Sequence, residues 1–289
     1  MIDTTLTIIG LIMYFIKYRK FMDKSEEEIK NYQLMTLKDL FKYSERLPYY
    51  SKLYEKHEFD PQVDFNTLSD IEKLPVLTKD SVRMNQKDII NYSLLPLSLK
   101  FRTSGTTGTP IDTYISYNHW IVEQAVIWRH WFKAGYKIFD HIAIIRSHNP
   151  KDGEEIIKKN SLKNWTYYSP YHLTQKNMEN YYRDMLLKRT KFLRGYPSSL
   201  AIFAEYCHKN GYTLPRLKAC LTASEVLSDA ERNLIEKTFN VQVYDHYGLA
   251  EPTIMLHNHG TEKSYINCPE YGYLELLPTS NQDVYRIIG

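Results

Sequence analysis

The chain has 289 residues, enough for one large or two ordinary domains and for a substantial buried core. Its hydrophobic fraction of 43% and charged fraction of 25% are those of a soluble globular protein. The net charge of +3, from 37 basic and 34 acidic residues, is too small to indicate a nucleic-acid partner. The three cysteines, Cys207, Cys220 and Cys268, form no close pair, which argues against a disulfide framework and favours a reducing cytoplasm.

The first 24 residues contain an apolar run from Thr4 to Ile16, with basic residues at 17, 19 and 20. The run is short for a bilayer span, and a signal peptide carries its positive charge before the apolar stretch rather than after it. We expect residues 1–24 to form a helix packed on the domain. An anchor on a membrane surface through residues 4–16 is the first alternative, and a true span is the second.

Residues 25–60 have a helical pattern that places apolar residues on one face, and prolines then mark loops. The expected face comprises Leu34, Leu37, Leu40 and Phe41, and the loop prolines are Pro48, Pro61 and Pro75. Further along, an apolar stretch at 94–99 precedes a segment rich in Thr, Ser and Gly at 102–110. A long helix is expected over 119–134 and a short strand over 141–146.

The region from 191 to 245 alternates between strand and helix patterns. The expected elements are a strand at 191–195, a helix at 198–209 with Gly211 just past its end, a strand at 217–222, a helix from the Ser228–Glu231 capping box to about Phe239, and a strand at 241–245. This rhythm is typical of a parallel sheet flanked by helices, so we predict an α/β fold.

Ligands of parallel sheets bind at the edge where the strands end. Three polar or aromatic segments follow the expected strands: Gly195–Ser198, Ala223–Glu225 and His246–Glu251. The pattern alone therefore predicts that these segments converge on one edge.

Residues 103–108 contain four hydroxyl residues and two glycines, which suit the binding of phosphate oxygens. The segment is not a Walker A loop, because the Gly-Lys-Ser/Thr ending is absent. Taken alone, it could equally be an ordinary surface loop. At 247–251, a Tyr-Gly pair is followed by Glu251, which could place an aromatic face and a Mg²⁺-binding carboxylate in one pocket. The alternative there is a turn with a buried tyrosine.

Together, TSGTTGTP at 103–110 and YGLAE at 247–251 resemble two signatures of the acyl-adenylating (AMP-forming) ligase superfamily, in the order and spacing of its phenylacetate–CoA ligase branch. That branch includes CapK-like proteins encoded in capsular-polysaccharide gene clusters. LPVLTK at 74–79, GYPS at 195–198 and ASEVLS at 223–228 extend the resemblance to about residues 40–288. The resemblance implies the α/β fold of the N-terminal part of an adenylate-forming ligase, here residues 25–289, with a partial β-hairpin at its C-terminal end.

The resemblance also implies roles for individual residues. Phosphates of ATP would be held by Thr103, Ser104, Gly105, Thr106, Thr107 and Gly108. The adenine pocket would be lined by Ala223, Ser224 and Glu225 and flanked by Tyr247 and Gly248, and the acyl pocket would be bordered by Tyr196 and Pro197. Glu251 would bind Mg²⁺, and Glu251 and Thr107 are the residues assigned to catalysis.

The implied reaction is attack of a substrate carboxylate on the α-phosphorus of ATP, giving acyl-AMP and pyrophosphate. Transfer of the acyl group to coenzyme A or another acceptor would follow. The expected partners are therefore ATP, Mg²⁺ and a small carboxylic acid, with no nucleic acid. The competing hypotheses are a non-catalytic nucleotide-binding or scaffold protein and a membrane-tethered partner in polysaccharide assembly.

Several positions depart from the family pattern. Thr109 stands where lysine is frequent, and Ser224 stands where glycine is usual. Some relatives bind zinc after the Tyr-Gly-x-x-Glu motif, and His257, His259 and Cys268 are suitable ligand types here. Their spacing does not match the expected one, so surface histidines and a buried thiol are the alternative.

The C-terminal end departs most. Strands are expected at 271–277 and 284–288, joined by a turn at 278–283, and the sequence stops at Gly289. The ribose-binding aspartate, the hinge and the small C-terminal domain with its catalytic lysine, which relatives carry, would come after this point. We therefore expect an incomplete domain, from a shortened gene product, a fragment, or a protein completed by another chain.

Overall fold

The computed structural model describes residues 4–102, 111–249, 251–262 and 264–289. The chain divides into two compact units. Unit 1 contains residues 1–126, 249–254 and 268–289, and unit 2 contains residues 127–248 and 255–267. The chain therefore passes several times from one unit to the other, and the first passage lies within a helix, between Val126 and Ile127.

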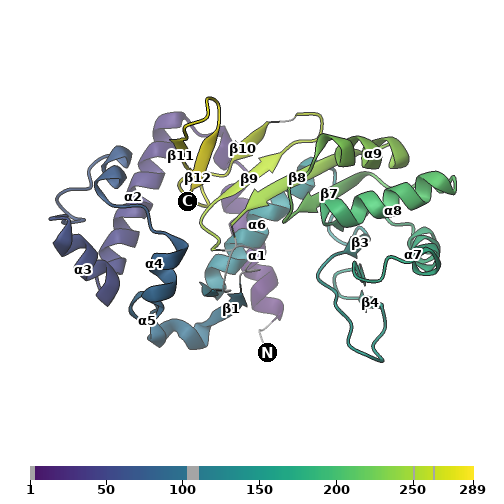
Figure 1. Cartoon of the computed structure of the whole chain (residues 1–289), viewed down its shortest axis with the longest axis horizontal. Coiled ribbons are helices and arrows are strands. Elements are labelled where there is room, and N and C mark those ends of the chain that lie inside the picture. Colours follow the sequence, from purple (N-terminus) through teal and green to yellow (C-terminus); the bar gives the residue numbers. More distant parts are fainter. Residues whose placement is uncertain (1–3, 103–110, 250, 263) are drawn as a thin grey trace. The chain divides into compact units, whose positions relative to one another are not determined.

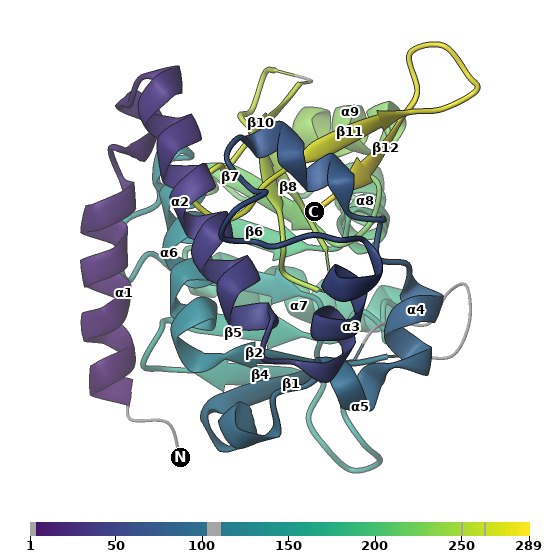
Figure 2. The same cartoon turned by 90° about the vertical axis from the view of Figure 1, so that its left-hand side faces the viewer.

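Unit 1 is mainly helical (Figure 2). Its helices are α1 (Thr4–Tyr18), α2 (Glu26–Ser44), α3 (Pro48–Lys56), α4 (Lys79–Met84), α5 (Gln86–Ile89) and the first part of α6 (Tyr117–Lys133), with 3-10 turns at Phe21–Asp23, Leu68–Lys73 and Tyr92–Leu97. Its described residues also form two antiparallel strand pairs, β1 (Ser98–Arg102) with β2 (Asp112–Ser116) and β11 (Glu275–Pro278) with β12 (Tyr285–Ile288). The β11–β12 pair confirms the expected C-terminal hairpin, with shorter strands.

The expected N-terminal helix is present as α1. It contacts α6 within unit 1, where Gly10 lies against the Ile121 side chain and the Tyr14 hydroxyl donates to Asn118 Oδ1 at 2.7 Å. Leu11 is buried at 6% exposure. Among the described residues, none of the helices combines the length and the apolar content that crossing a bilayer requires.

The helical pattern over 25–60 splits into two helices. A capping box of Ser25 and Glu28 starts α2, and Pro48 occupies the first turn of α3 rather than a loop, because proline at that position loses no hydrogen bond. Phe41 packs edge-on against Phe65 in a small core with Tyr54 and Phe59. The prediction for Leu40 was wrong: its side chain is 55% exposed, because it points away from this core.

Unit 2 is built on one sheet, which in its described part has eight strands in the order β10-β9-β8-β7-β6-β3-β5-β4 (Figure 1). The strands are β3 (Ile142–Ile145), β4 (Ile157–Asn160), β5 (Trp165–Tyr168), β6 (Phe192–Gly195), β7 (Ala219–Ala223), β8 (Gln242–Gly248), β9 (Met255–Asn258) and β10 (Tyr265–Asn267). The five central strands, from β5 to β8, run parallel, and β4, β9 and β10 run antiparallel to their neighbours. The parallel sheet predicted from the sequence is confirmed.

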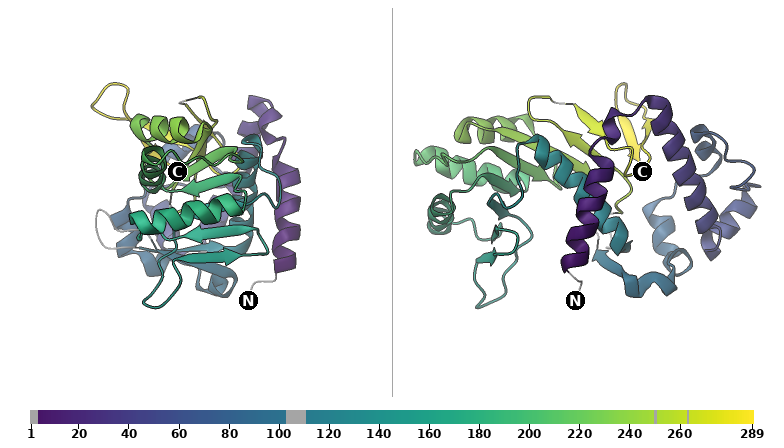
Figure 3. Two further views of the ribbon diagram at one scale, coloured as in Figure 1. Left: turned by 90° about the vertical axis from the view of Figure 1, so that its right-hand side faces the viewer. Right: turned by 180° about the vertical axis from the view of Figure 1, so that it is seen from behind.

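One face of the sheet is covered by helices α7 (Gln175–Leu187), α8 (Pro197–Lys209) and α9 (Asp229–Phe239), the green helices of Figure 3. Phe203, Leu193 and Val243 belong to the apolar core between them, and each is 0% exposed. The capping box of Ser228 and Glu231 starts α9 as predicted, because each side chain bonds the other residue's backbone N–H.

The opposite face of the sheet carries polar and aromatic side chains. The Arg194 guanidinium lies 4.8 Å from the ring centroid of Trp131, in the last turn of α6, and Tyr136 packs against Phe192. Side chains alternate between the two faces along each strand, so Leu193 points into the apolar core while its neighbours point away from it.

Candidate functional site

The edge of the sheet at which the parallel strands end is the candidate site, which we call the rim. Ile145 of β3 pairs with Gly195 of β6, and Gly195 pairs with Thr222 of β7. On the next strand, Ala223 pairs with His246 of β8. The ends of β6, β7 and β8 therefore lie side by side within unit 2, which confirms the predicted convergence for the points at which the three segments begin.

Gly195 allows close packing at the rim. A Cβ atom at this position would lie 2.6 Å from Leu200 Cδ2 and 2.9 Å from the carbonyl oxygen of Ile145. Real Cβ atoms do not approach other atoms so closely, so glycine lets β6 turn directly into α8 beside β3. Pro197, in the first turn of α8, is buried.

Two of the predicted segments contact each other directly. The carboxylate of Glu225 accepts a hydrogen bond from Ser198 Oγ at 2.6 Å and one from the Ser198 backbone N–H at 3.3 Å. The bond therefore ties the turn after β7 to the first turn of α8. The assignment of Glu225 to an adenine pocket stays a prediction.

Ser224 has a left-handed backbone, with φ of +73°. Glycine adopts this conformation at no steric cost, which explains why glycine is usual at this position in the resembling family. In this chain the serine Oγ accepts a hydrogen bond from Arg146 Nη2 at 3.2 Å. The departure from the family pattern thus brings a specific contact with it.

Arg146 and Ser147 lie at the rim, although the sequence prediction did not assign them to the site. The Arg146 guanidinium is 5.3 Å from the centroid of the Tyr196 ring, and Ser147 Oγ is 3.3 Å from the Tyr196 hydroxyl. The sequence could have indicated Arg146, because this residue ends the strand expected at 141–146. The ends of parallel strands lie at the same edge of a sheet, which places Arg146 near Gly195.

The third predicted segment is divided between the units. Tyr247 and Gly248 belong to unit 2: the Tyr247 side chain is 37% exposed, and Gly248 pairs with Met255 of β9. Glu251 is half-buried and belongs to unit 1. The predicted phosphate loop at 103–108, with Thr107, lies outside the described residues. Its proximity to Tyr247 and Glu251 therefore stays a prediction.

Asp245 is a buried carboxylate immediately before the rim, 3% exposed. Thr222 Oγ1 donates to Asp245 Oδ1 at 2.5 Å, and the Tyr265 hydroxyl donates to Oδ2. Burial raises the pKa of Asp245, while these two hydrogen bonds and the charge of Arg232 act in the opposite direction. The side chain thus links β7, β8 and β10 beneath the predicted Tyr-Gly segment.

Histidines gather on the polar face of the sheet. The rings of His130 and His257 stack with centroids 4.2 Å apart, and His246 and His259 also have ring contacts with His130. His130 Nε2 lies 2.7 Å from the carbonyl oxygen of Asn258. Burial lowers the pKa of His130 to about 4 and holds those of His246 and His257 well below the usual value.

This cluster changes how the residues considered for zinc are interpreted. His257 is 2% exposed, so the expectation of a surface histidine was wrong for this residue. Cys268 is buried in unit 1, whereas His257 and His259 belong to unit 2. Within the described ranges, no group of three or more His, Cys, Asp or Glu side chains is arranged to hold a metal ion.

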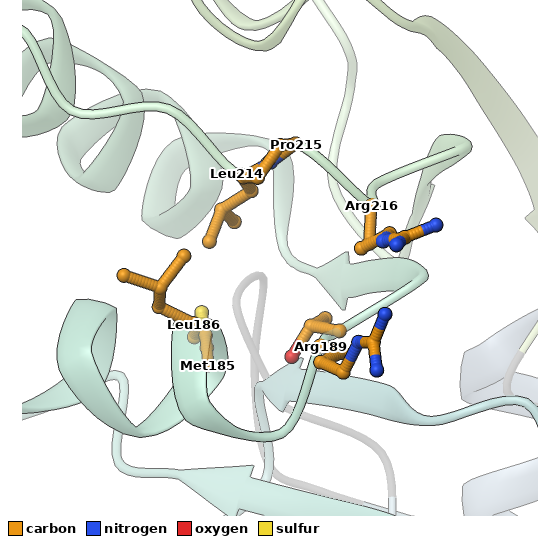
Figure 4. A pocket seen from close by; sticks show the side chains of 7 residues that line it. Met185, Leu186, Arg189, Leu214, Pro215 and Arg216 are labelled. Carbon is orange, nitrogen blue, oxygen red and sulfur yellow. The ribbon is translucent and has the colours of Figure 1, made fainter.

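A small cavity in unit 2 lies away from the rim (Figure 4). It is lined by Met185, Leu186, Arg189, Thr190, Leu214, Pro215 and Arg216. Residues 189–190 and 214–216 precede β6 and β7, so the cavity lies where those strands begin, opposite the edge where parallel sheets bind ligands. The cavity is therefore distinct from the candidate site.

Comparison with solved structures identifies the fold. 2-Hydroxyisobutyryl-CoA ligase, in complex with 2-HIB-AMP and CoA in the thioesterification state, matches with a TM-score of 0.63 and 18% sequence identity, over 80% of this chain and 52% of the ligase. An open conformation of the same ligase, with the same two ligands, gives a TM-score of 0.60 at 17% identity, over 77% of this chain and 51% of the ligase. The chain has the fold of the N-terminal domain of an adenylate-forming ligase.

Sequence comparison gives a related result. Protein CapK of Staphylococcus aureus is 26% identical over 214 residues, which cover 70% of this chain and 46% of CapK. No family model matches the chain. The chain is thus similar in sequence to CapK and similar in fold to the acyl-CoA ligase, as the resemblance to a CapK-like branch predicts. The chain spans about half the length of the proteins it matches.

Proposed function

We propose that the chain takes part in the ATP-dependent activation of a carboxylic acid to an acyl-adenylate, with later transfer of the acyl group to coenzyme A or another acceptor. The observation that carries the proposal is the rim, where the GYPS and ASE segments of the ligase pattern meet in a chain with the adenylate-forming fold. The motifs at 103–108 and 247–251 supply the nucleotide-binding part of the same pattern.

The nucleotide would lie against the end of β8 and the turn after β7. The exposed ring of Tyr247 offers an aromatic face for the adenine, and Ala223, Ser224 and Glu225 would border the base. Gly248 would lie beside the α-phosphate. The hydroxyls and backbone N–H groups of 103–108 would hold the remaining phosphates.

Glu251 suits the Mg²⁺ that would accompany ATP, because it is a half-buried carboxylate and hard divalent cations prefer carboxylate oxygens. When bound, Mg²⁺ would neutralise phosphate charge as pyrophosphate leaves. The chain's own part is to hold that carboxylate in place. The carbonyl oxygen of the neighbouring residue, Pro252, accepts a hydrogen bond from His119 Nε2 at 3.0 Å.

The acid would bind beside Tyr196 and Pro197. Pro197 is fixed by the start of α8, and Tyr196 is positioned by the Arg146 guanidinium and the Ser147 hydroxyl. This arrangement orients the substrate without a covalent contribution from the protein, as expected for a reaction that depends on alignment of the attacking carboxylate and on charge stabilisation.

Calorimetry with ATP and with AMP, followed by a pyrophosphate-release assay over a panel of carboxylic acids, tests the proposal. We expect the chain to bind ATP, and Tyr247→Ala to weaken binding about 10-fold through lost stacking of about 1–3 kcal/mol. Tyr285→Ala, at a tyrosine of β12 that is 54% exposed and outside both motifs, is the matched control and should leave binding unchanged.

Two results would decide against catalysis. Binding of ATP without release of pyrophosphate for any acid would favour the non-catalytic nucleotide-binding or scaffold protein. Absence of ATP and AMP binding would remove both functions. Glu251→Gln keeps the shape of the side chain and removes its charge, so we expect it to abolish the Mg²⁺ dependence of ATP binding while leaving AMP binding intact.

The biological setting is part of the proposal. A phenylacetate–CoA ligase-like role and a role in surface-polysaccharide biosynthesis are both compatible with the motifs, and the similarity to CapK supports the second. We propose a cytoplasmic location, with contact between residues 4–16 and a membrane surface as the alternative. Fractionation of cells would separate the two, since a wholly soluble protein would exclude the membrane contact.

A further inference from the structure

The rim contains a guanidinium to which the proposed reaction gives no contact with the substrate. Arg146 directly follows β3, and it contacts Tyr196 after the neighbouring strand β6 and Ser224 after β7, the next strand along. All three residues belong to unit 2, and the Arg146 side chain is half-buried. A charged group in this position needs a chemical reason, because a pocket for a purely apolar acid would gain nothing from it.

Arg146 is held in position by two neighbours. Its guanidinium lies 5.3 Å from the centroid of the Tyr196 ring, a cation–π distance, and its Nη2 donates to Ser224 Oγ at 3.2 Å. The Tyr196 hydroxyl lies 3.3 Å from Ser147 Oγ, so the ring is itself fixed from the other side. The arginine is therefore oriented before any ligand arrives, which lowers the entropy lost on binding.

Ser224 is the least expected member of this group. A non-glycine residue with φ of +73° carries a steric cost, and glycine would remove it. The serine hydroxyl accepts a hydrogen bond from Arg146, and glycine has no side chain that could do so. The strained residue and the arginine thus form one structural unit at the rim.

The surroundings add positive charge. Arg194 of β6 lies in register with Ile144, two residues before Arg146, on the same face of the sheet. Burial raises the pKa of the Tyr167 phenol, and the charges of Arg194 and Arg146 both act to lower it. Both charges likewise oppose protonation of His246. The carboxylate of Glu225, at the turn after β7, accepts hydrogen bonds from Ser198.

A guanidinium presents five N–H donors in a rigid fork, enough to bond Ser224 and a carboxylate at the same time. We propose that Arg146 binds a second carboxylate on the acid that the chain activates, so that the substrate class is the dicarboxylic acids. This inference rests on the proposed function for the identity of the first carboxylate, which would face the nucleotide. Arg146 would then determine specificity, and Ser224 would position it.

Direct binding to a matched pair of acids tests the proposal. Succinate and butyrate both contain four carbons and differ in the second carboxylate. We expect calorimetry with the full chain to give succinate an affinity at least 10-fold higher than that of butyrate. Arg146→Gln should abolish this preference, and Arg146→Lys should restore only part of it, because an ammonium lacks the planar fork.

Arg216→Gln is the matched control, since Arg216 is exposed and precedes β7 at the opposite edge of the sheet. It should leave the preference unchanged. Ser224→Gly removes the hydroxyl while relieving the backbone, so it should keep or raise the melting temperature yet reduce the preference for succinate about 3-fold or more. A merely structural serine would change the melting temperature and leave the preference intact.

Two results would overturn the inference. The first is equal affinities of the unmodified chain for succinate and butyrate, and the second is an unchanged preference in Arg146→Gln. If the unchanged preference came with a loss of ATP affinity, the arginine would be assigned to a nucleotide phosphate instead.

The same titrations separate this inference from the proposed function. Arginine-dependent binding of succinate by a chain that binds no ATP would support the dicarboxylate site and reject the activation reaction. ATP binding and pyrophosphate release with no preference between the two acids would reject the site and support the reaction.

Discussion

The two faces of the sheet in unit 2 carry side chains of different polarity. The face under α7, α8 and α9 is an apolar core in which Leu193, Phe203 and Val243 have no exposed surface. The other face carries Arg194, the histidine cluster and, at the rim, Arg146 with Tyr196. Both faces belong to the same strands, and successive side chains of a strand point to opposite faces. This alternation is enough to place the residues of the apolar core on one face and the polar residues on the other.

The comparison predicts that substitutions on the two faces will change different properties of the protein. A change in the apolar face should lower the free energy of unfolding without altering what the rim binds. A change on the polar face or at the rim should alter pH dependence or binding while changing stability less.

The largest effect is expected from Phe203→Ala on the apolar face. Phe203 is 0% exposed, so truncation should lower the free energy of unfolding by about 3–5 kcal/mol through lost burial and a residual cavity. Urea denaturation measures this. Its neighbour Ile202 is 47% exposed, and Ile202→Ala should cost about 1 kcal/mol or less. Equal losses would contradict the assignment of faces.

Gly195→Ala tests the junction between the apolar face and the rim. The added methyl would meet Leu200 and the Ile145 carbonyl oxygen, and we expect a loss of about 2 kcal/mol from the resulting backbone shift. The same denaturation experiment gives the value. An unchanged midpoint would mean that Leu200 rearranges and that the close approach does not require glycine.

The polar face should make stability depend on pH. His130 has a folded-state pKa of about 4, lowered mainly by burial and further by His259, Lys133 and Arg129. The unfolded chain takes up the proton below about pH 6.5, whereas the folded chain stays neutral until about pH 4. Stability contributed by this group is therefore complete above pH 6.5 and falls between pH 6.5 and 4.

At pH 5.5 we expect His130 alone to account for a loss of about 1 kcal/mol relative to pH 7.5. The lowered pKa values of His246 and His257 should add to it with the same sign. Urea denaturation at several pH values measures the slope. His130→Gln should flatten it, and a stability that rises on acidification would contradict the buried, neutral state of the cluster.

The smallest effect is expected from Ser198→Ala at the rim. This change removes the hydroxyl that donates to Glu225 at 2.6 Å, while the exposed position lets water replace it. We expect a loss of about 0.5 kcal/mol in the free energy of unfolding. A loss comparable to that of Phe203→Ala would show that the rim is part of the core.

Much of unit 2 could be predicted because its sequence signals are local. The capping box of Ser228 and Glu231 predicts where a helix begins. The apolar strands at 191–195, 217–222 and 241–245 alternate with helices at short spacing. Parallel pairing follows from that alternation, and because parallel strands end at one edge of the sheet, Gly195–Ser198 lies beside Ala223–Glu225. The same reasoning predicts the position of Arg146, which depends only on β3 being a neighbour of β6.

Other features depend on contacts between distant segments, which the sequence pattern does not carry. The stacking of His130 on His257 joins residues from α6 and β9, and periodicity says nothing about which partner either ring will find. Leu40 satisfies a helical pattern and is nevertheless exposed, because the width of the apolar face depends on what packs against α2. Ser224 needed backbone angles before its bond to Arg146 could be understood.

The repeated passage of the backbone between the two units has a practical consequence. No single peptide-bond cleavage can release either unit as one continuous piece, because 249–254 and 268–289 return to unit 1 after most of unit 2 is complete. A protease acting on the loops should therefore yield nicked chains that stay associated under native conditions and separate only in denaturant. During synthesis, too, unit 1 lacks one of its segments until residues 268–289 have been made.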